Sequence, residues 1–199
     1  MRLHHFLVLI VTLSGTTHAG ENLLGDGNLG TGPVPPWVTV PVTGLSYSVI
    51  ANDGQPAPSV EITTGGPSGS SSSGQGLYQC VPTTAGKVYR LSAYVKRTSA
   101  STTTVSAVGL AAVFYTGTTC NVGGGFPLGL GNATVGPNTL VTNVWTAVNS
   151  GPVTAPGGTS SALVGLGANG ANSAVYTFRA DTAFLGLNDV IFYNGFEND

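Results

Sequence analysis

The sequence is poor in charge and in long apolar stretches, and each shortage excludes a class of protein. Only 7% of the 199 residues are charged, so the chain offers no basic surface for nucleic acid or for an anionic membrane. The longest apolar run, FLVLIVTL, falls well short of the roughly 20 residues that span a bilayer. No Gly-x-Ser-x-Gly elbow of a serine hydrolase is present.

That short apolar run belongs to an expected export signal. Residues 1–19 combine a basic start at Arg2, the apolar run, and small residues at Thr17 and Ala19, which is the pattern of a cleaved signal peptide. We expect the mature chain to begin near Gly20, to be secreted or periplasmic, and to be a monomer.

Histidine is missing from the expected mature chain. His4, His5 and His18 all lie within the predicted signal peptide. Their loss excludes a Ser-His or Cys-His nucleophile pair and any histidine-ligated metal site. The predicted signal peptide also holds one base and no acid, so the mature chain is mildly acidic.

Cysteine occurs only twice, at Cys80 and Cys120. In an exported chain two cysteines most often pair, although two separate buried thiols are the alternative. A disulfide here would close a loop of about 40 residues, worth roughly 4 kcal/mol of stability in the chain-entropy treatment.

What the sequence has in abundance is glycine, at 30 positions, together with apolar residues that alternate with polar ones. Recurring period-2 runs and no sustained helical period predict an all-β fold, a two-sheet antiparallel β-sandwich in one domain over residues 20–199. The Ser-Gly tract 65–76 and the glycine-rich stretch 120–132 are interpreted as loops. The predicted strands are 36–40, 45–51, 58–63, 76–82, 88–97, 104–116, 139–149, 161–167, 174–180 and 189–193.

Two of these strands are especially informative. In VYRLSAYVKR (88–97), one face is apolar and the other carries Arg90, Tyr94 and Lys96. In TVSAVGLAAVFY (104–115), both faces are apolar. The second strand should therefore be central, covered by the other sheet on one side and by loops or a ligand groove on the other.

Four segments, taken in order, resemble carbohydrate-binding modules of families 4, 9 and 22. They are NLLGDGNLGTG with the early Trp37, YQCVPTTAGKVYRLSAYVKR, VWTAVNSGPVTAPGGTSSALVGL and LNDVIFY, which together cover nearly all of residues 22–193. The resemblance implies a jelly-roll β-sandwich that binds polysaccharide or cell-wall glycan.

The resemblance also implies a structural calcium ion between the N-terminal turn and the last strand. The sequence departs from the family there, because Gly30 and Asn188 stand where acidic residues are usual. Asp189 and neighbouring carbonyls, with Asp26 or Asn28 in addition, remain as hard oxygen ligands. Alternatively, these groups satisfy a turn and a strand end.

Residues 25–30, GDGNLG, also match the G-x-G-x-x-G pattern of dinucleotide-binding loops. Such a loop follows a buried strand and opens a helix. Here the motif leads into TGPVPPW, which does not begin a helix, so we interpret it as the first turn of the sandwich.

Sugar binding needs flat apolar platforms flanked by polar groups. Tyr94 with Arg90 fits this need, against the alternative that Tyr94 packs on a neighbouring strand. Tyr78 is a further candidate. Trp145 is either a platform or a structural core residue, and Tyr115 borders either a cleft or an ordinary loop.

Catalysis is not expected. Only four acids lie away from the chain ends. Asp53 is expected in an exposed turn, and Glu61, within the predicted strand 58–63, is the one that we consider as a candidate for a catalytic acid. A glycosidase needs two carboxyl groups about 5 to 10 Å apart, and no such pair is evident. The expected function is carbohydrate binding, with a structural or adhesive extracellular domain as the alternative.

Overall fold

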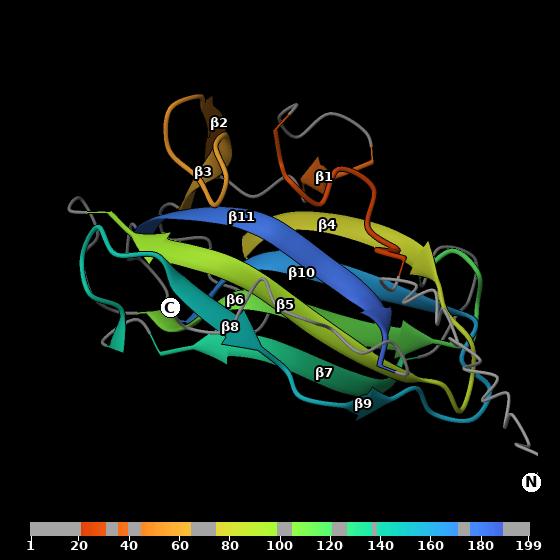
Figure 1. Cartoon of the computed structure of the whole chain (residues 1–199). Coiled ribbons are helices and arrows are strands. Elements are labelled where there is room, and N and C mark those ends of the chain that lie inside the picture. The colour runs from red at the N-terminus through yellow and green to blue at the C-terminus, as the bar shows by residue number, and fades with distance from the viewer. Residues whose placement is uncertain are drawn as a thin grey trace, which may run out of the picture.

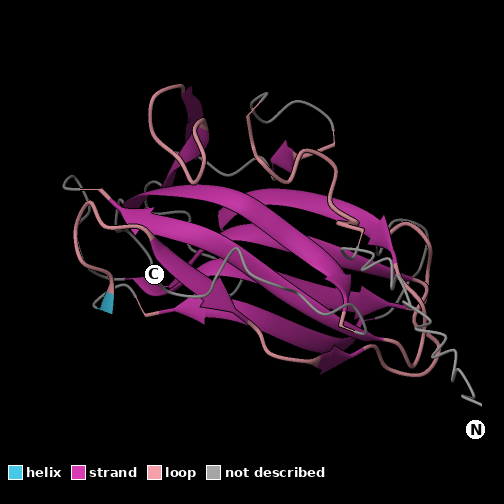
Figure 2. Ribbon diagram, viewed as in Figure 1, coloured by secondary structure: helices cyan, strands magenta, loops and turns pink. Residues whose placement is uncertain are grey.

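The fold is a sandwich of two antiparallel β-sheets, as the sequence predicts (Figure 1). A computed structural model describes 21–30, 36–39, 45–64, 75–98, 105–120, 127–136, 139–170 and 176–188. Eleven strands lie in these residues, and nearly all of their regular structure is strand (Figure 2). Within this part of the chain, no helix is long and apolar enough to cross a membrane.

The first sheet, called sheet A, has five strands in the order β1-β4-β10-β6-β7. All of its neighbours pair antiparallel. Its strands are β1 (Val38–Thr39), β4 (Gln75–Pro82), β6 (Val105–Tyr115), β7 (Pro127–Val135) and β10 (Ser161–Gly170).

The second sheet, called sheet B, has the order β2-β3-β11-β5-β8, with β9 also pairing with β5. The β2-β3 hairpin stands out from the sandwich at the top of the view (Figure 1). Its strands are β2 (Ser46–Ile50), β3 (Ser59–Thr64), β5 (Val88–Arg97), β8 (Thr146–Asn149), β9 (Val153–Thr154) and β11 (Tyr176–Leu187).

The core lies between the sheets and follows the predicted alternation. In β5, Leu91, Ala93 and Val95 are fully buried, and in β6, Leu110 and Phe114 are too. Since β6 lies between β10 and β7, the prediction that its sequence forms a central strand is confirmed.

Strand β7 was not predicted, because its sequence PLGLGNATV falls partly in the stretch interpreted as a glycine-rich loop. The structure gives its glycines a packing role. A Cβ on Gly129 would lie 2.9 Å from the Pro156 side chain, and one on Gly131 would lie 2.9 Å from that of Val153. Here glycine lets the strand pack closely, although it is usually depleted in strands.

Other boundaries also differ from the prediction. Residues 139–145 are not a strand, because Asn143 has a φ of 64° and the chain turns there. Strand β11 continues to Leu187 through a register shift between Asp181 and Phe184. The predicted strand 189–193 lies outside the described residues.

Cys80 and Cys120 form a disulfide, which confirms the predicted pairing. Trp37 is a core residue with 1% of its surface exposed.

Candidate functional site

The outer face of sheet A, turned away from the core, contains a shallow groove of about 230 Å³. This is smaller than the roughly 300 to 1,000 Å³ of pockets that enclose a small molecule. A ligand would therefore lie along the groove with part of its surface in solvent. The groove is lined by Tyr78, Gly109, Ala111, Val113, Asn132, Thr134, Leu163, Gly165, Leu166, Gly167 and Ala168.

The strand register arranges these residues in rows across the sheet. The central row runs Val38, Tyr78, Gly165, Ala111 and Asn132, one residue from each of the five strands. Neighbouring strands are about 4.8 Å apart, so the row spans about 19 Å. That length suits an extended chain better than a single small molecule.

Tyr78 is the aromatic residue of the groove. A Cβ on Gly165 would lie 2.9 Å from Cε1 and 3.1 Å from Cδ1 of Tyr78. The tyrosine ring thus lies across the place where a side chain at position 165 would be. Glycine in β10 is what lets this ring lie low over the sheet.

A second row has even less side-chain volume. Gly76, Gly167 and Gly109 are register neighbours on β4, β10 and β6, and Thr134 of β7 completes the row. Gly109 has a φ of 140°, and a Cβ there would lie 2.3 Å from the carbonyl oxygen of Ala133. Another residue at this position would strain the backbone as well as fill the groove.

The groove carries no formal charge. None of the five strands of sheet A contains Asp, Glu, Lys or Arg. Burial raises the pKa of the Tyr78 phenol above its ordinary value, so this group is neutral at physiological pH. The polar side chains of the groove are Tyr78 on one side of the apolar floor, and Asn132 and Thr134 on the other.

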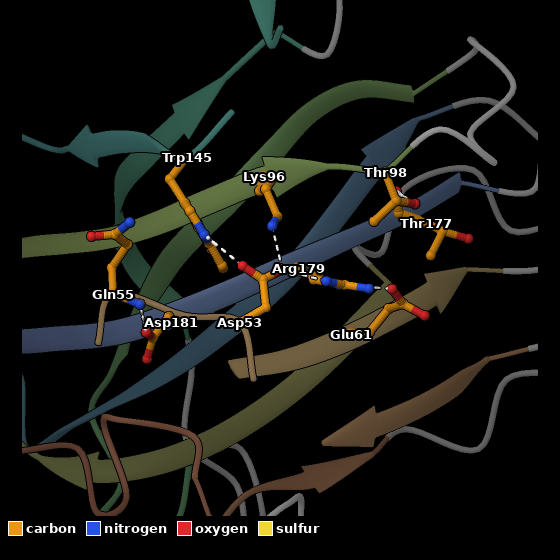
Figure 3. A network of polar contacts seen from close by, with 9 residues as sticks. All are labelled: Asp53, Gln55, Glu61, Lys96, Thr98, Trp145, Thr177, Arg179 and Asp181. Atoms are coloured by element: carbon orange, nitrogen blue, oxygen red, sulfur yellow. Dashed lines mark hydrogen bonds and ion pairs between the residues drawn. The ribbon is translucent and has the colours of Figure 1, made fainter. Parts of the chain in front are cut away.

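The outer face of sheet B is different, because charged side chains cover it. The Asp53 carboxylate, from the loop between β2 and β3, forms ion pairs with Lys96 of β5 and Arg179 of β11. Nε of Arg179 also donates to Glu61 Oε2 of β3 at 2.9 Å. These contacts fasten the loop onto the sheet (Figure 3).

Trp145 belongs to this same network and is half-buried. Its Nε1 donates to Asp53 Oδ1 at 3.1 Å, and Lys96 Nζ lies 4.8 Å from the centre of its ring. The structure therefore shows a tryptophan that packs over a charged cluster, whereas the sequence offered a sugar platform or a core residue.

The Asn-Asp-Gly context of Asp53 predicts an exposed turn. In the structure its carboxylate is instead held against sheet B by Lys96 and Arg179. Desolvation would raise the pKa of its carboxyl group, but the hydrogen bonds from Lys96, Arg179 and Trp145 together outweigh that effect and lower the pKa to about 2. The carboxylate is thus held ionised by its two cations and the indole N–H.

Asp181, next along the same face, behaves in the opposite way. It is fully buried, and its carboxylate accepts the backbone N–H of Gln55 and that of Thr182. Desolvation raises its pKa and outweighs these hydrogen bonds. The ion pairs of Asp53 and the hydrogen bond from Gln55 to Asp181 thus hold residues 53–55 of the β2–β3 loop against sheet B.

The structure does not bring the predicted sugar-binding residues together. Tyr94, Arg90 and Trp145 lie on the sheet B side, where Arg90 Nε donates to Oδ1 of Asn188. Tyr78 lies in the groove of sheet A. Tyr115, which is 9% exposed, ends β6 beyond the groove.

Asp26 and Asn28, two of the predicted calcium ligands, lie in the N-terminal turn. Oδ1 of Asp26 accepts the N–H of Gly30 at 3.3 Å, and the Asp26 carbonyl accepts those of Leu29 and Trp37 Nε1. Asn28 is exposed. Among the described residues, no three acidic, cysteine or histidine side chains cluster as metal ligands would.

Calcium takes six to eight oxygen ligands, and backbone carbonyls can supply some of them. Asp189 lies outside the described residues. Calcium binding stays a prediction.

Several groove residues were not singled out in the sequence, among them Asn132, Thr134 and Leu163. The sequence nevertheless contains a signal that indicates this face of the sheet. The five strands of sheet A contain no charge, and glycines recur at alternate positions in β10, at Gly165 and Gly167. Outward-facing glycines in a central strand mark a place where another molecule can approach the backbone.

Comparison with known proteins gives the fold. No family model and no curated protein matches the sequence. The structure is similar to a xylan-binding family 22 module from Paenibacillus barcinonensis, with a TM-score of 0.54, 19% identity, and coverage of 85% of this chain and 96% of that one.

Two structures from Clostridium thermocellum are also similar. One is a C-terminal family 22 carbohydrate-binding module, with a TM-score of 0.53, 12% identity and coverage of 80% and 90% of the two chains. The other is a xylanase fragment that joins such a module to a catalytic module, in complex with xylohexaose. Its TM-score is 0.52 at 15% identity, and the match covers 76% of this chain but only 26% of that one. The chain therefore shares the β-sandwich of carbohydrate-binding modules.

Proposed function

We propose that this protein is an exported, non-catalytic module that binds an uncharged polysaccharide in the groove of sheet A. The observation that carries the proposal is the Tyr78 ring, which lies low over Gly165 and faces Asn132 across an apolar floor. The Cys80–Cys120 disulfide supports export, because disulfides persist in oxidising compartments.

The groove has the chemistry that a neutral sugar chain requires. The apolar face of a pyranose ring packs on an aromatic ring, and its hydroxyls bond to amide and hydroxyl groups. Tyr78 supplies the first kind of contact, and Asn132 and Thr134 supply the second. A uronate or a sulfate would find no cation in the strands beneath it.

Binding without cleavage is favoured by where the acids lie. Hydrolysis of a glycosidic bond uses two carboxyl groups about 5 to 10 Å apart. The acids in the described strands, Glu61 and Asp181, are both in sheet B, across the core from the groove.

Xylan is the first polymer to test, since the similar domain from Paenibacillus barcinonensis binds it. The experiment is affinity electrophoresis in gels that contain xylan, mixed-linkage glucan or polygalacturonate. We expect retardation by a neutral polymer and none by polygalacturonate.

The Tyr78→Ala variant tests the site, with Tyr94→Ala as the matched control on the opposite sheet. Loss of one stacked ring should weaken binding by about tenfold or more, whereas Tyr94→Ala should migrate like the original protein. If no neutral polymer retards the protein, a structural or adhesive role replaces this proposal. If only Tyr94→Ala loses retardation, the binding face is sheet B.

A further inference from the structure

A short turn crosses the outer face of sheet A at one end of the groove. Residues 116–120, called the strap, leave the end of β6, and their last residue forms the disulfide with Cys80 of β4. Strand β10 lies between β4 and β6. The strap therefore passes over the beginning of β10.

Hydrogen bonds hold the strap down on β10. The Ser161 hydroxyl donates to the carbonyl of Gly117, and the N–H of Cys120 donates to Ser161 Oγ at 3.3 Å. The N–H of Ser160 donates to the carbonyl of Tyr115 at 2.9 Å. Ser161 faces outward by strand alternation but is fully buried, because the strap covers it.

The strap begins where the groove ends. On β10 the outward residues are Gly165, then Leu163, then Ser161, and the first two line the groove. On β6, Val113 lines the groove, and the next outward residue, Tyr115, is almost buried. Cys80 is two residues from Tyr78, on the same face of β4.

We propose that the strap is a wall of the binding groove and that the Cys80–Cys120 disulfide sets the affinity of the groove by holding this wall in place. The inference rests on the proposed function. Cys80 is exposed, so a reductant can reach the bond.

The physical reason is preorganisation. A wall that is fixed before binding costs no ordering when the ligand arrives, whereas a loose turn must be ordered at that moment. The disulfide fixes the far end of the strap to β4, the peptide chain fixes its near end to β6, and these two strands are not hydrogen-bonded neighbours. Without it, only the bonds to β10 remain.

The experiment compares the oxidised protein with the Cys80→Ala, Cys120→Ala double variant. Affinity for the polymer that retards the original protein is measured at a temperature where circular dichroism shows both to be folded. We expect binding about three- to tenfold weaker in the double variant. Equal or tighter binding overturns the inference while leaving the proposed function intact.

Ser161→Ala provides a second test that keeps the disulfide and removes the hydroxyl contacts to the strap. We expect a smaller loss of affinity in the same direction, with Ser92→Ala in sheet B as the matched control. If both serine variants bind like the original protein, the strap is not a wall of the site.

Hydrogen exchange tests the wall without any ligand. Reduction of the oxidised protein should speed exchange of the Cys120 amide and lower its protection below that of the Val95 amide in sheet B, which reports global unfolding. Unchanged exchange at Cys120 overturns the inference even if no polymer binds, which separates this failure from failure of the proposed function.

Discussion

The outer faces of the two sheets differ in charge and in what covers them. The strands of sheet A contain no charged residue, and the outer face is a neutral groove with a floor of glycine and small apolar residues. The strands of sheet B carry both signs of charge, and a loop is fastened over them through Asp53.

The difference shows how a face is kept open or covered. A loop over sheet B leaves Lys96 almost buried, and Asp53 of the same loop supplies the carboxylate that pairs with it. A face without charges needs no such cover, so a ligand can reach its backbone and small side chains. The groove of sheet A and the charged cluster of sheet B are therefore expected to respond to mutation independently.

The largest expected effect on stability is on the side of sheet A. Reduction of the disulfide, with its sequence separation of 40, should lower the free energy of unfolding by up to about 4 kcal/mol. Urea unfolding of oxidised and reduced protein, followed by tryptophan fluorescence, measures it. A difference below about 1 kcal/mol would show that loop closure in the unfolded chain is not what the disulfide restricts.

The next largest effect is expected when the ion pairs on the outer face of sheet B are removed. Asp53→Ala leaves Lys96 without the carboxylate that pairs with it and should lower the free energy of unfolding by about 2 to 3 kcal/mol. The Trp145 emission should shift to the red as the loop lifts, while polymer binding stays unchanged. Weaker polymer binding in this variant would mean that the two faces are coupled.

Acid should reproduce part of that loss. The folded pKa of Asp53, about 2, is below the ordinary value of about 4 for an aspartate, so its ionised form stabilises the fold above about pH 4. That stabilisation, roughly 2 kcal/mol, is lost as the pH falls from about 4 to about 2.

The control for acid unfolding is Asp53→Ala, whose stability should not fall over the same pH window. The raised pKa of Asp181 works in the other direction, since protonation of that group favours the folded state. A parallel decline in the variant would assign the acid sensitivity to other carboxylates.

The smallest effect concerns a single hydrogen bond. Trp145→Phe keeps an aromatic ring beside Lys96 but removes the N–H donated to Asp53 at 3.1 Å. We expect a loss of about 1 kcal/mol in thermal or urea unfolding. A loss as large as that of Asp53→Ala would mean that the indole, more than the ion pairs, holds the loop.

Much of the fold was readable from alternation along the chain. The bounds of β5 match the prediction, and the apolar faces of β6 correctly indicated a central strand with a groove or loops outside it. The disulfide followed from export and from the count of two cysteines. In each case one local pattern carried the information.

The site was harder to predict because it depends on which strands are neighbours. Tyr94 and Tyr78 have similar local contexts, yet they lie in different sheets. The central row joins residues as distant in sequence as Val38 and Gly165, and only the strand order β1-β4-β10-β6-β7 brings them together. Strand β7 was missed because its glycines serve packing against the other sheet.

The floor of glycines has a consequence for how this protein can change. Gly165 and Gly167 already have the smallest side chain available, so any substitution adds atoms to the groove. Mutation can make the site narrower or more selective at these positions, and it cannot make the floor deeper. Any side chain added at either position would therefore restrict the shapes that fit the groove.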